Sequence, residues 1–135
     1  MTSVIERIEA CFGKMSVTRG SAHTFLGMDL NFLGDGTMTV KMKDYLIDAI
    51  KKSGLAIGRT AATPAKRDLF EINEDSEPLG KLECEAFHST VATLLYVAIR
   101  ARMDILLPVS FLCTRVSKST KQDEAKLKRV LEYLN

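Results

Sequence analysis

The first apolar residues of the chain recur at the spacing of one helical face. They are Val4, Ile5, Ile8 and Phe12. Ser3 and Glu6 form a capping-box pattern at the beginning of this stripe, and Gly13 follows its last residue. We therefore expect an amphipathic N-terminal helix that ends at Gly13.

From His23 the apolar period changes to two, which is the period of a half-buried strand. The alternating apolar residues are Leu26, Met28, Leu30 and Phe32, followed by Met38, Val40 and Met42. Gly34, Asp35 and Gly36 separate the two runs and tolerate the positive φ angles of a tight turn. The pattern predicts an antiparallel β-hairpin with one apolar face between Ala22 and Met42.

Helical spacing returns after the hairpin and predicts a second helix over residues 43–53. Lys51 and Lys52 lie in its last turn, and Gly54 stands where a C-cap glycine belongs. Residues 58–82 contain prolines, glycines and an acidic run without any sustained period. We expect a long surface connection there.

The last third of the chain predicts three helices in series. In the first, over residues 83–102, the apolar residues on one side are Phe87, Val91, Leu94, Leu95, Ala98 and Ile99. Asp104 is placed to cap a helix over residues 105–115, and Thr120 with Asp123 forms a capping pattern before the final helix. The fold class expected is α+β: an N-terminal helix, an antiparallel β-hairpin and then a mainly helical part.

Length and composition suit one domain or a piece of one. The chain has 135 residues, of which 46% are hydrophobic, and its formal net charge of +2 gives no strong electrostatic argument for a nucleic-acid partner. The three cysteines lack the paired spacing of a zinc site or a disulfide framework. We therefore expect a reduced, intracellular location, cytoplasmic or nuclear. Because no apolar run approaches the roughly 18 residues of a membrane span, we expect no membrane partner.

Motifs of independent catalysis are missing from the sequence. There is no Asp-Asp pair, no P-loop, no dinucleotide fingerprint and no Gly-x-Ser-x-Gly turn. His23 and His88 are isolated from cysteines and carboxylates at ligand spacing, and Asp29 and Asp35 are better explained as a polar-face residue and a turn former. We expect no catalytic residue, no metal ligand and no cofactor in this chain.

The order of motifs resembles the C-terminal part of the reverse transcriptase region in copia-type retrotransposon polyproteins. The later motifs are AFHSTVATLLYVAIRARMDI at 86–105, VSFL at 109–112 and LKRVLEYL at 127–134. The earlier ones are TFLGMDL at 24–30, KDYLI at 43–47 and TP at 63–64. The chain departs from the family pattern at Phe87, where a tyrosine is usual, at His88, where an arginine is usual, and at Met103, where a proline is usual.

The resemblance implies that residues 22–42 are the primer-grip hairpin, which holds the 3′ end of the primer near the catalytic metals. The primer-grip residues would be Phe25, Leu26, Gly27 and Met28. Displacing a primer end by about an ångström can cost roughly a hundredfold in rate, so such a hairpin has to be rigid. Gly27 would let a backbone or the nucleic acid approach closely, or would only relieve crowding in the sheet.

Four lysines gather around the end of the hairpin and the second helix: Lys41, Lys43, Lys51 and Lys52. Taken alone, they are better explained as solvated surface charges. With the resemblance, they become candidates to neutralise phosphates of an RNA/DNA template-primer duplex.

The resemblance also implies a division of the chain and a missing partner. Residues 1–57 would be the end of the palm, 58–82 a linker and 83–135 a segment like the thumb and connection. The parent family uses Mg²⁺ held by aspartates upstream of these motifs, so this chain alone is expected to be inactive and to work with the palm and fingers of the parent polymerase. The alternative is a free-standing interaction or self-associating module whose exposed apolar faces bind a protein.

Overall fold

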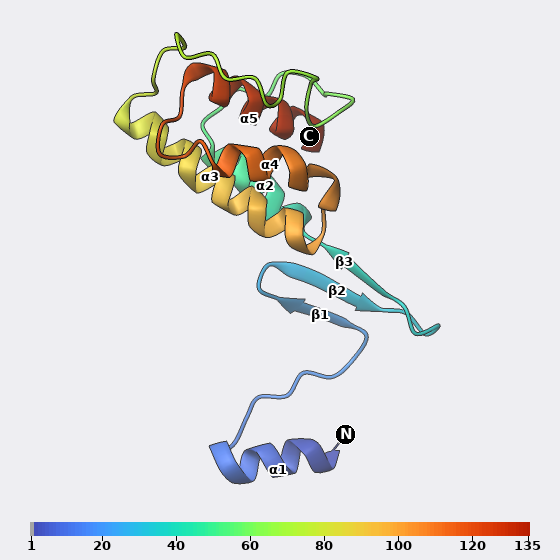
Figure 1. Ribbon diagram of the computed structural model, residues 1–135. Coiled ribbons are helices and arrows are strands. Elements are labelled where there is room, and N and C mark those ends of the chain that lie inside the picture. Colours follow the sequence, from blue (N-terminus) through green and yellow to red (C-terminus); the bar gives the residue numbers. More distant parts are fainter. Residues whose placement is uncertain (1) are drawn as a thin grey trace.

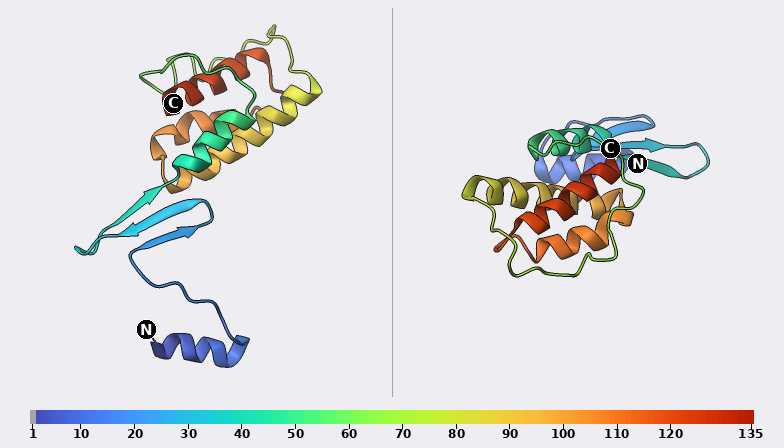
Figure 2. Two further views of the ribbon diagram at one scale, coloured as in Figure 1. Left: turned by 180° about the vertical axis from the view of Figure 1, so that it is seen from behind. Right: turned by 90° about the horizontal axis from the view of Figure 1, so that it is seen from above.

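The computed structural model describes residues 2–135 and confirms the α+β fold (Figure 1). In chain order its elements are α1 (Thr2–Phe12), β1 (Ala22–Phe25), β2 (Met28–Phe32), β3 (Met38–Lys41), α2 (Lys43–Lys52), α3 (Lys81–Arg100), the short 3-10 helix η1 (Met103–Ile105), α4 (Leu106–Cys113) and α5 (Lys121–Leu134). The helical body lies at one end, the sheet in the middle and α1 at the other end; Figure 2 shows the same separation from behind.

The N-terminal helix forms as predicted and ends where Gly13 adopts a φ of 85°. The Gly13 amide donates a hydrogen bond of 2.9 Å to the carbonyl of Glu9. The apolar stripe of α1 faces solvent, since Val4 is 55% exposed and Phe12 is 84% exposed. The stripe is therefore a surface feature and adds nothing to the core of the helical body.

The predicted hairpin contains one strand more than expected. The run read as a single strand is two strands, β1 and β2, joined by a turn at Leu26 and Gly27 with φ angles of 50° and 77°. Positive φ at both central residues is the type I′ turn that matches the twist of antiparallel strands. The apolar pattern hid this turn, because Leu26 lies two residues before Met28 and so continues the alternation of β2 into the loop.

The second turn of the sheet is the one that the sequence predicted. Asp35 accepts hydrogen bonds from the amide and the hydroxyl of Thr37, at 2.9 and 2.7 Å, which confirms it as a turn former. The sheet has strand order β1-β2-β3, with both pairs antiparallel. Its register places apolar residues on one face: Phe25, Met28, Leu30, Phe32, Met38 and Val40.

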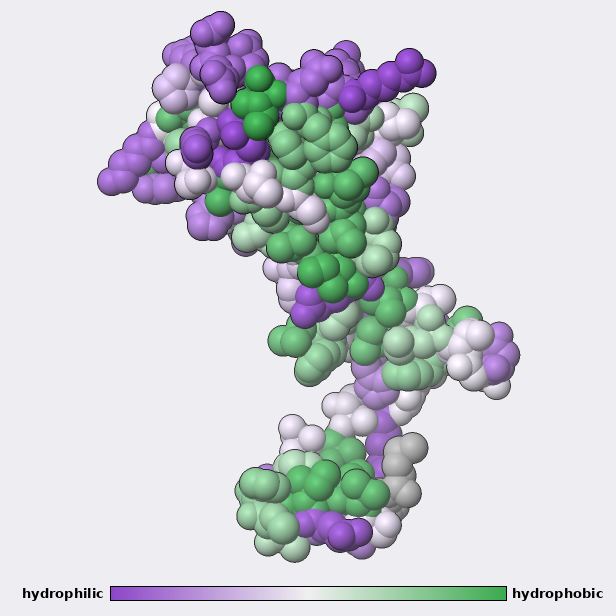
Figure 3. All heavy atoms as spheres, viewed as in Figure 1, coloured by the Kyte–Doolittle hydropathy of each residue, from purple (hydrophilic) through white to green (hydrophobic). Residues whose placement is uncertain are grey.

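The opposite face of the sheet is polar, and the apolar face is only partly covered. Phe25, Phe32 and Met38 are 58%, 49% and 46% exposed. Figure 3 shows hydrophobic surface over the sheet and along α1 on the viewed side. Exposed contiguous apolar surface of this kind marks an interaction site in soluble proteins.

The helical body is built around α3, with α2 on one side and α4 and α5 on the other (Figures 1 and 2). The predicted stripe of α3 is confirmed at Phe87, Val91, Leu94 and Ala98, all buried. Ile99 was predicted to face the core and is instead 57% exposed. In this turn the core-facing residues are Val97 and Ala98, both fully buried, and Ile99 lies outside the side of the helix that they form.

The segment from 58 to 82 follows α5 for part of its length. Ala61 donates its amide to the carbonyl of Glu132 at 2.9 Å, and Leu79 donates to Ser119 at 3.0 Å. Ala61, Leu69 and Leu79 are buried. The division of the chain into residues 1–57, 58–82 and 83–135 stays a prediction.

The two caps expected in the last third have different outcomes. Asp123 accepts hydrogen bonds from the amide and hydroxyl of Thr120, at 3.0 and 3.1 Å, and so confirms the capping pattern of α5. Asp104 was predicted to cap the next helix, but no side-chain cap is formed there. The Asp104 carboxylate binds Arg102 and Tyr133 instead.

Among residues 2–135, no helix is both long enough and apolar enough to cross a membrane.

Candidate nucleic-acid interface

The turn between β1 and β2 rests on the helical body through two tyrosines. The hydroxyl of Tyr96, on α3, donates a hydrogen bond of 2.7 Å to the carbonyl of Leu26. The ring of Tyr45, on α2, lies 5.3 Å from the Tyr96 ring, centroid to centroid. The guanidinium of Arg100 lies over the Tyr96 ring, 3.7 Å from the ring centroid. The tip of the hairpin is thereby held at a defined place on α2 and α3.

Two features of the structure explain why residue 27 is a glycine. A Cβ placed on it would lie 2.8 Å from Cδ2 of Tyr45, closer than side-chain atoms pack. Its φ of 77° is also a conformation that residues with a side chain adopt at a cost. Gly27 therefore makes room for the Tyr45 ring, a contact that the sequence did not predict, and the approach of nucleic acid to Gly27 stays a prediction.

The predicted primer-grip residues lie together at this tip. Phe25 and Leu26 are 58% and 62% exposed, whereas Met28 is half-buried. The backbone of Leu26 is fixed by Tyr96 while its side chain faces solvent. The tip therefore offers exposed apolar surface at a place fixed by a hydrogen bond to α3.

The four predicted phosphate-binding lysines are all exposed but do not form one cluster. Lys41 ends β3 and Lys43 begins α2, and both line a groove of about 480 Å³. Lys51 and Lys52 occupy the other end of α2, about 12 Å further along the helix at a rise of about 1.5 Å per residue. Lys52 lines a separate hollow beside α3.

Arg102 joins Lys41 and Lys43 in the groove at the base of the hairpin. Its guanidinium makes a forked contact with Asp104, with the NH2 nitrogen 2.8 Å from Oδ2 and Nε 3.0 Å from Oδ1. Tyr133 donates to the same Oδ2 at 2.8 Å. Arg102 first and Tyr133 second lower the pKa of Asp104 from 3.8 to about 2.

Sequence reasoning did not single out Tyr45 or Tyr96 as parts of a site. Tyr45 and Tyr96 are half-buried on helices whose neighbouring residues form the core. A tyrosine at the edge of an apolar stripe needs a partner for its hydroxyl, and that need was the available signal. The partner could not be inferred, because Leu26 and Tyr96 are 70 residues apart in the chain.

Among residues 2–135, no three side chains of His, Cys, Asp or Glu are grouped so that they could share a metal ion. The acidic residues of the sheet are engaged locally, since Thr24 donates to Asp29 at 3.1 Å and Thr37 donates to Asp35. These side chains do not fit the site of two Mg²⁺ ions that polymerase chemistry uses.

The chain is similar to a protein of a yeast transposon. Over 117 residues the chain is 29% identical to the "Putative transposon Ty5-1 protein" of Saccharomyces cerevisiae. The similarity covers 85% of this chain and 37% of that protein. It indicates a retrotransposon-related protein. No family model matches the chain, and no solved structure matches it.

The extent of the similarity bears on the site. An alignment over 85% of the chain is longer than the helical body alone, which begins at α2. The relation to a retrotransposon protein therefore extends beyond any single motif. The chain spans only about a third of that relative's length.

Proposed function

We propose that the chain is the part of a copia-type reverse transcriptase that holds primer and template. In this proposal the β1–β2 tip is the primer grip, with Phe25, Leu26, Gly27 and Met28 against the primer end. The single observation that carries it is the anchoring of that tip by Tyr96 and Tyr45. Support comes also from the similarity to a transposon Ty5-1 protein and from the order of the sequence motifs.

The anchored tip suits this role because a primer end must be held still. Three features restrict it: the hydrogen bond from Tyr96 to Leu26, the absence of space for a Cβ on Gly27, and the two positive φ angles of a type I′ turn. Effective catalysis requires reacting atoms about 3 to 3.5 Å apart, so a loosely held primer end would react slowly.

The groove at the base of the hairpin supplies positive charge next to the tip. This charge comes from the exposed side chains of Lys41 and Lys43 at its edge, since Arg102 in the same groove is paired with Asp104. The duplex backbone would lie against these residues, with Lys51 and Lys52 contacting phosphates further along. Binding of this kind is independent of sequence and weakens as salt rises.

The apolar face of the sheet suits the palm of the parent polymerase. Phe25, Phe32 and Met38 are each close to half exposed or more, and a palm packed over them would bury them. The catalytic aspartates and their two Mg²⁺ ions would belong to that palm, where the metals would stabilise the attacking and leaving oxygens. This chain's own residues would bind and orient the duplex and would not polymerise alone.

The test is binding of the full chain to an RNA–DNA duplex at several salt concentrations, followed by fluorescence anisotropy. Removing the charges of Lys41 and Lys43 together, as K41Q with K43Q, should flatten the slope of log affinity against log salt by about 2. A double change at exposed sites on the far side, K81Q with K118Q, is the matched control and should keep the slope. Equal slopes for wild type and the K41Q/K43Q protein would refute the proposal.

A second candidate is a self-associating or protein-binding module, which the exposed stripe of α1 favours. Val4 is 55% exposed, Phe12 is 84% exposed and Ile8 is 37% exposed. Association through such a stripe would be nearly insensitive to salt, whereas duplex binding is salt-sensitive. Sedimentation of the chain with and without duplex separates the two candidates.

A further inference from the structure

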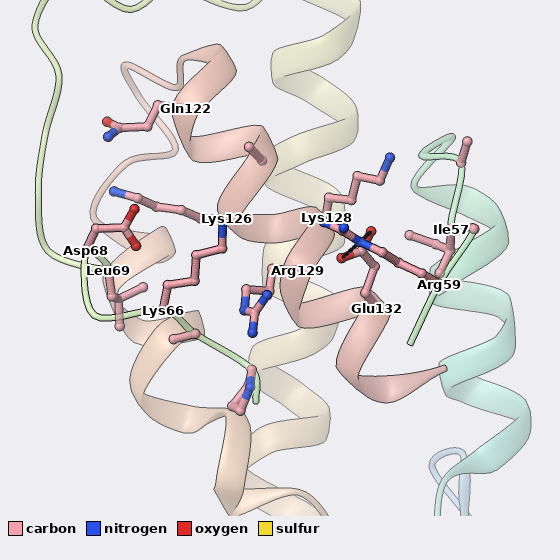
Figure 4. A pocket seen from close by; sticks show the side chains of 15 residues that line it. Ile57, Arg59, Lys66, Asp68, Leu69, Gln122, Lys126, Lys128, Arg129 and Glu132 are labelled. Atoms are coloured by element: carbon pink, nitrogen blue, oxygen red, sulfur yellow. Dashed lines mark hydrogen bonds and ion pairs between the residues drawn. The ribbon is translucent and has the colours of Figure 1, made fainter. Parts of the chain in front are cut away.

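A groove of about 710 Å³ lies between α5 and the segment from 56 to 69, away from the hairpin (Figure 4). Its volume falls within the roughly 300 to 1,000 Å³ typical of small-molecule sites. Its apolar lining residues include Ile57, Pro64 and Leu69. Nothing in the proposed primer-holding role uses this groove.

Positive charge outweighs negative charge around the groove. The basic residues that line it are Arg59, Lys66, Lys126, Lys128 and Arg129, and the acidic ones are Asp68 and Glu132. Glu132 is almost fully buried and already paired, since Nε of Arg59 lies 3.3 Å from its Oε1. In Figure 4 the side chains of Lys66 and Arg129 point into the space between the segment and α5.

Arg129 is the residue that indicates the kind of ligand. One terminal nitrogen of its guanidinium donates to the hydroxyl of Thr63 at 3.0 Å. Its Nε is buried and has no hydrogen-bond partner among the described residues. Because Nε is shielded from solvent, a ligand in the groove would meet the terminal nitrogens of the guanidinium, which the contact with Thr63 helps to hold in place.

A phosphate group fits this donor better than a neutral acceptor does. A guanidinium binds the oxygens of a phosphate through two parallel donors, and Lys66 can add a second charge from the opposite wall. The apolar lining residues Ile57, Pro64 and Leu69 offer surface for the rest of the ligand. The groove is large enough for a group of mononucleotide size.

We propose that this groove binds the phosphate of a nucleotide, with Arg129 and Lys66 as its principal contacts. The nucleotide is either free or part of a single strand, because both carry the same phosphate chemistry. The site is separate from the β1–β2 tip, and the inference does not rest on the proposed primer-holding function.

The test measures binding of the full chain to two probes, adenosine monophosphate and an oligothymidylate of about ten nucleotides. R129Q and K66Q should each weaken binding of the recognised probe by about tenfold. K118Q removes one charge from an exposed site outside the groove and should leave affinity unchanged. K66Q alters an exposed loop residue, and so its effect is readable even where R129Q perturbs the fold.

A direct readout is the side-chain Nε–H resonance of Arg129 in an NMR spectrum, which should shift when the probe is added. Binding of the monophosphate assigns a free nucleotide, and binding of the oligonucleotide alone assigns a strand. The proposal is overturned if neither probe binds, if K66Q and R129Q both bind as wild type does, or if a polyglutamate peptide binds more tightly than either probe.

Discussion

At the residue scale, Gly27 and Tyr45 form the contact on which the tip of the sheet depends. The change G27A places a methyl group 2.8 Å from the Tyr45 ring and holds alanine at a φ of 77°. We expect the free energy of unfolding of the hairpin to fall by about 1 to 2 kcal/mol. Urea unfolding followed by NMR signals of the sheet measures this loss.

The matched control for that change is G34A. A Cβ on Gly34 meets nothing within 4 Å, and its φ is not in the left-handed region. Stability should therefore stay within about 0.5 kcal/mol of wild type, as for ordinary surface substitutions. If the two alanine variants lost equal stability, crowding by Tyr45 would not be the reason for Gly27.

Tyr96 holds the same turn through the residue next to Gly27, Leu26. The change Y96F removes the hydroxyl that donates to Leu26 at 2.7 Å and keeps the ring beside Tyr45. Loss of one hydrogen bond of this kind costs about 1 kcal/mol. Amide hydrogen exchange in β1 and β2 should quicken by roughly fivefold, while Y45F, which keeps the ring that faces Gly27, should leave exchange close to wild type. Unchanged exchange in the Y96F protein would contradict the anchoring.

Asp104 predicts how stability responds to acid. Its pKa is depressed from 3.8 to about 2 in the folded chain, mainly by Arg102. A carboxyl group whose pKa is lower in the folded chain stabilises the fold at pH values above its ordinary pKa. This contribution is lost as the pH falls through the pKa of the folded chain. Between about pH 5 and pH 2 the D104N protein should therefore lose less stability than wild type, which thermal unfolding at several pH values measures. Parallel pH profiles for the two proteins would contradict this reading of Asp104.

At the element scale, the start of α5 depends on one buried carboxylate. Asp123 is 1% exposed, accepts from Thr120 and is paired with Arg115, whose Nε lies 3.2 Å from its Oδ1. The change D123A leaves Arg115 without its partner and removes the cap, so we expect a loss of about 3 kcal/mol. Chemical denaturation measures it, with E124A in the same turn as control. A loss no larger than that of E124A would contradict the role of the buried pair.

Elements with long periodic patterns were predictable, and so was the turn marked by Gly34, Asp35 and Gly36, whereas the turn at Leu26 was not. The stripes of α3 and α5 carry several turns of apolar residues, so their existence follows from the sequence. The turn at Leu26 was hidden because leucine is an uncommon residue at positive φ and only Gly27 marked it. Asp104 was assigned to a cap because a local partner is the usual one, whereas Tyr133, on α5, competes for it across the fold.

For the molecule as a whole, the resemblance in the sequence indicated a relation to retrotransposons. The similarity to a transposon Ty5-1 protein supports that relation. The placement of functional residues needed coordinates. Lys41 and Lys43 lie apart from Lys51 and Lys52 because α2 separates them, and the groove beside α5 joins residues far apart in the chain. Contacts of that sequence separation leave no periodic signal in a single sequence.

Amide hydrogen exchange of the full chain, with and without an RNA–DNA duplex, tests whether the hairpin holds primer and template. If the chain holds primer and template through the anchored hairpin, adding duplex should slow exchange in residues 22–42 and at the start of α2, and raising the salt concentration should reverse the effect. Exchange in that region that is unchanged by duplex, with the duplex bound elsewhere or not at all, would contradict the account.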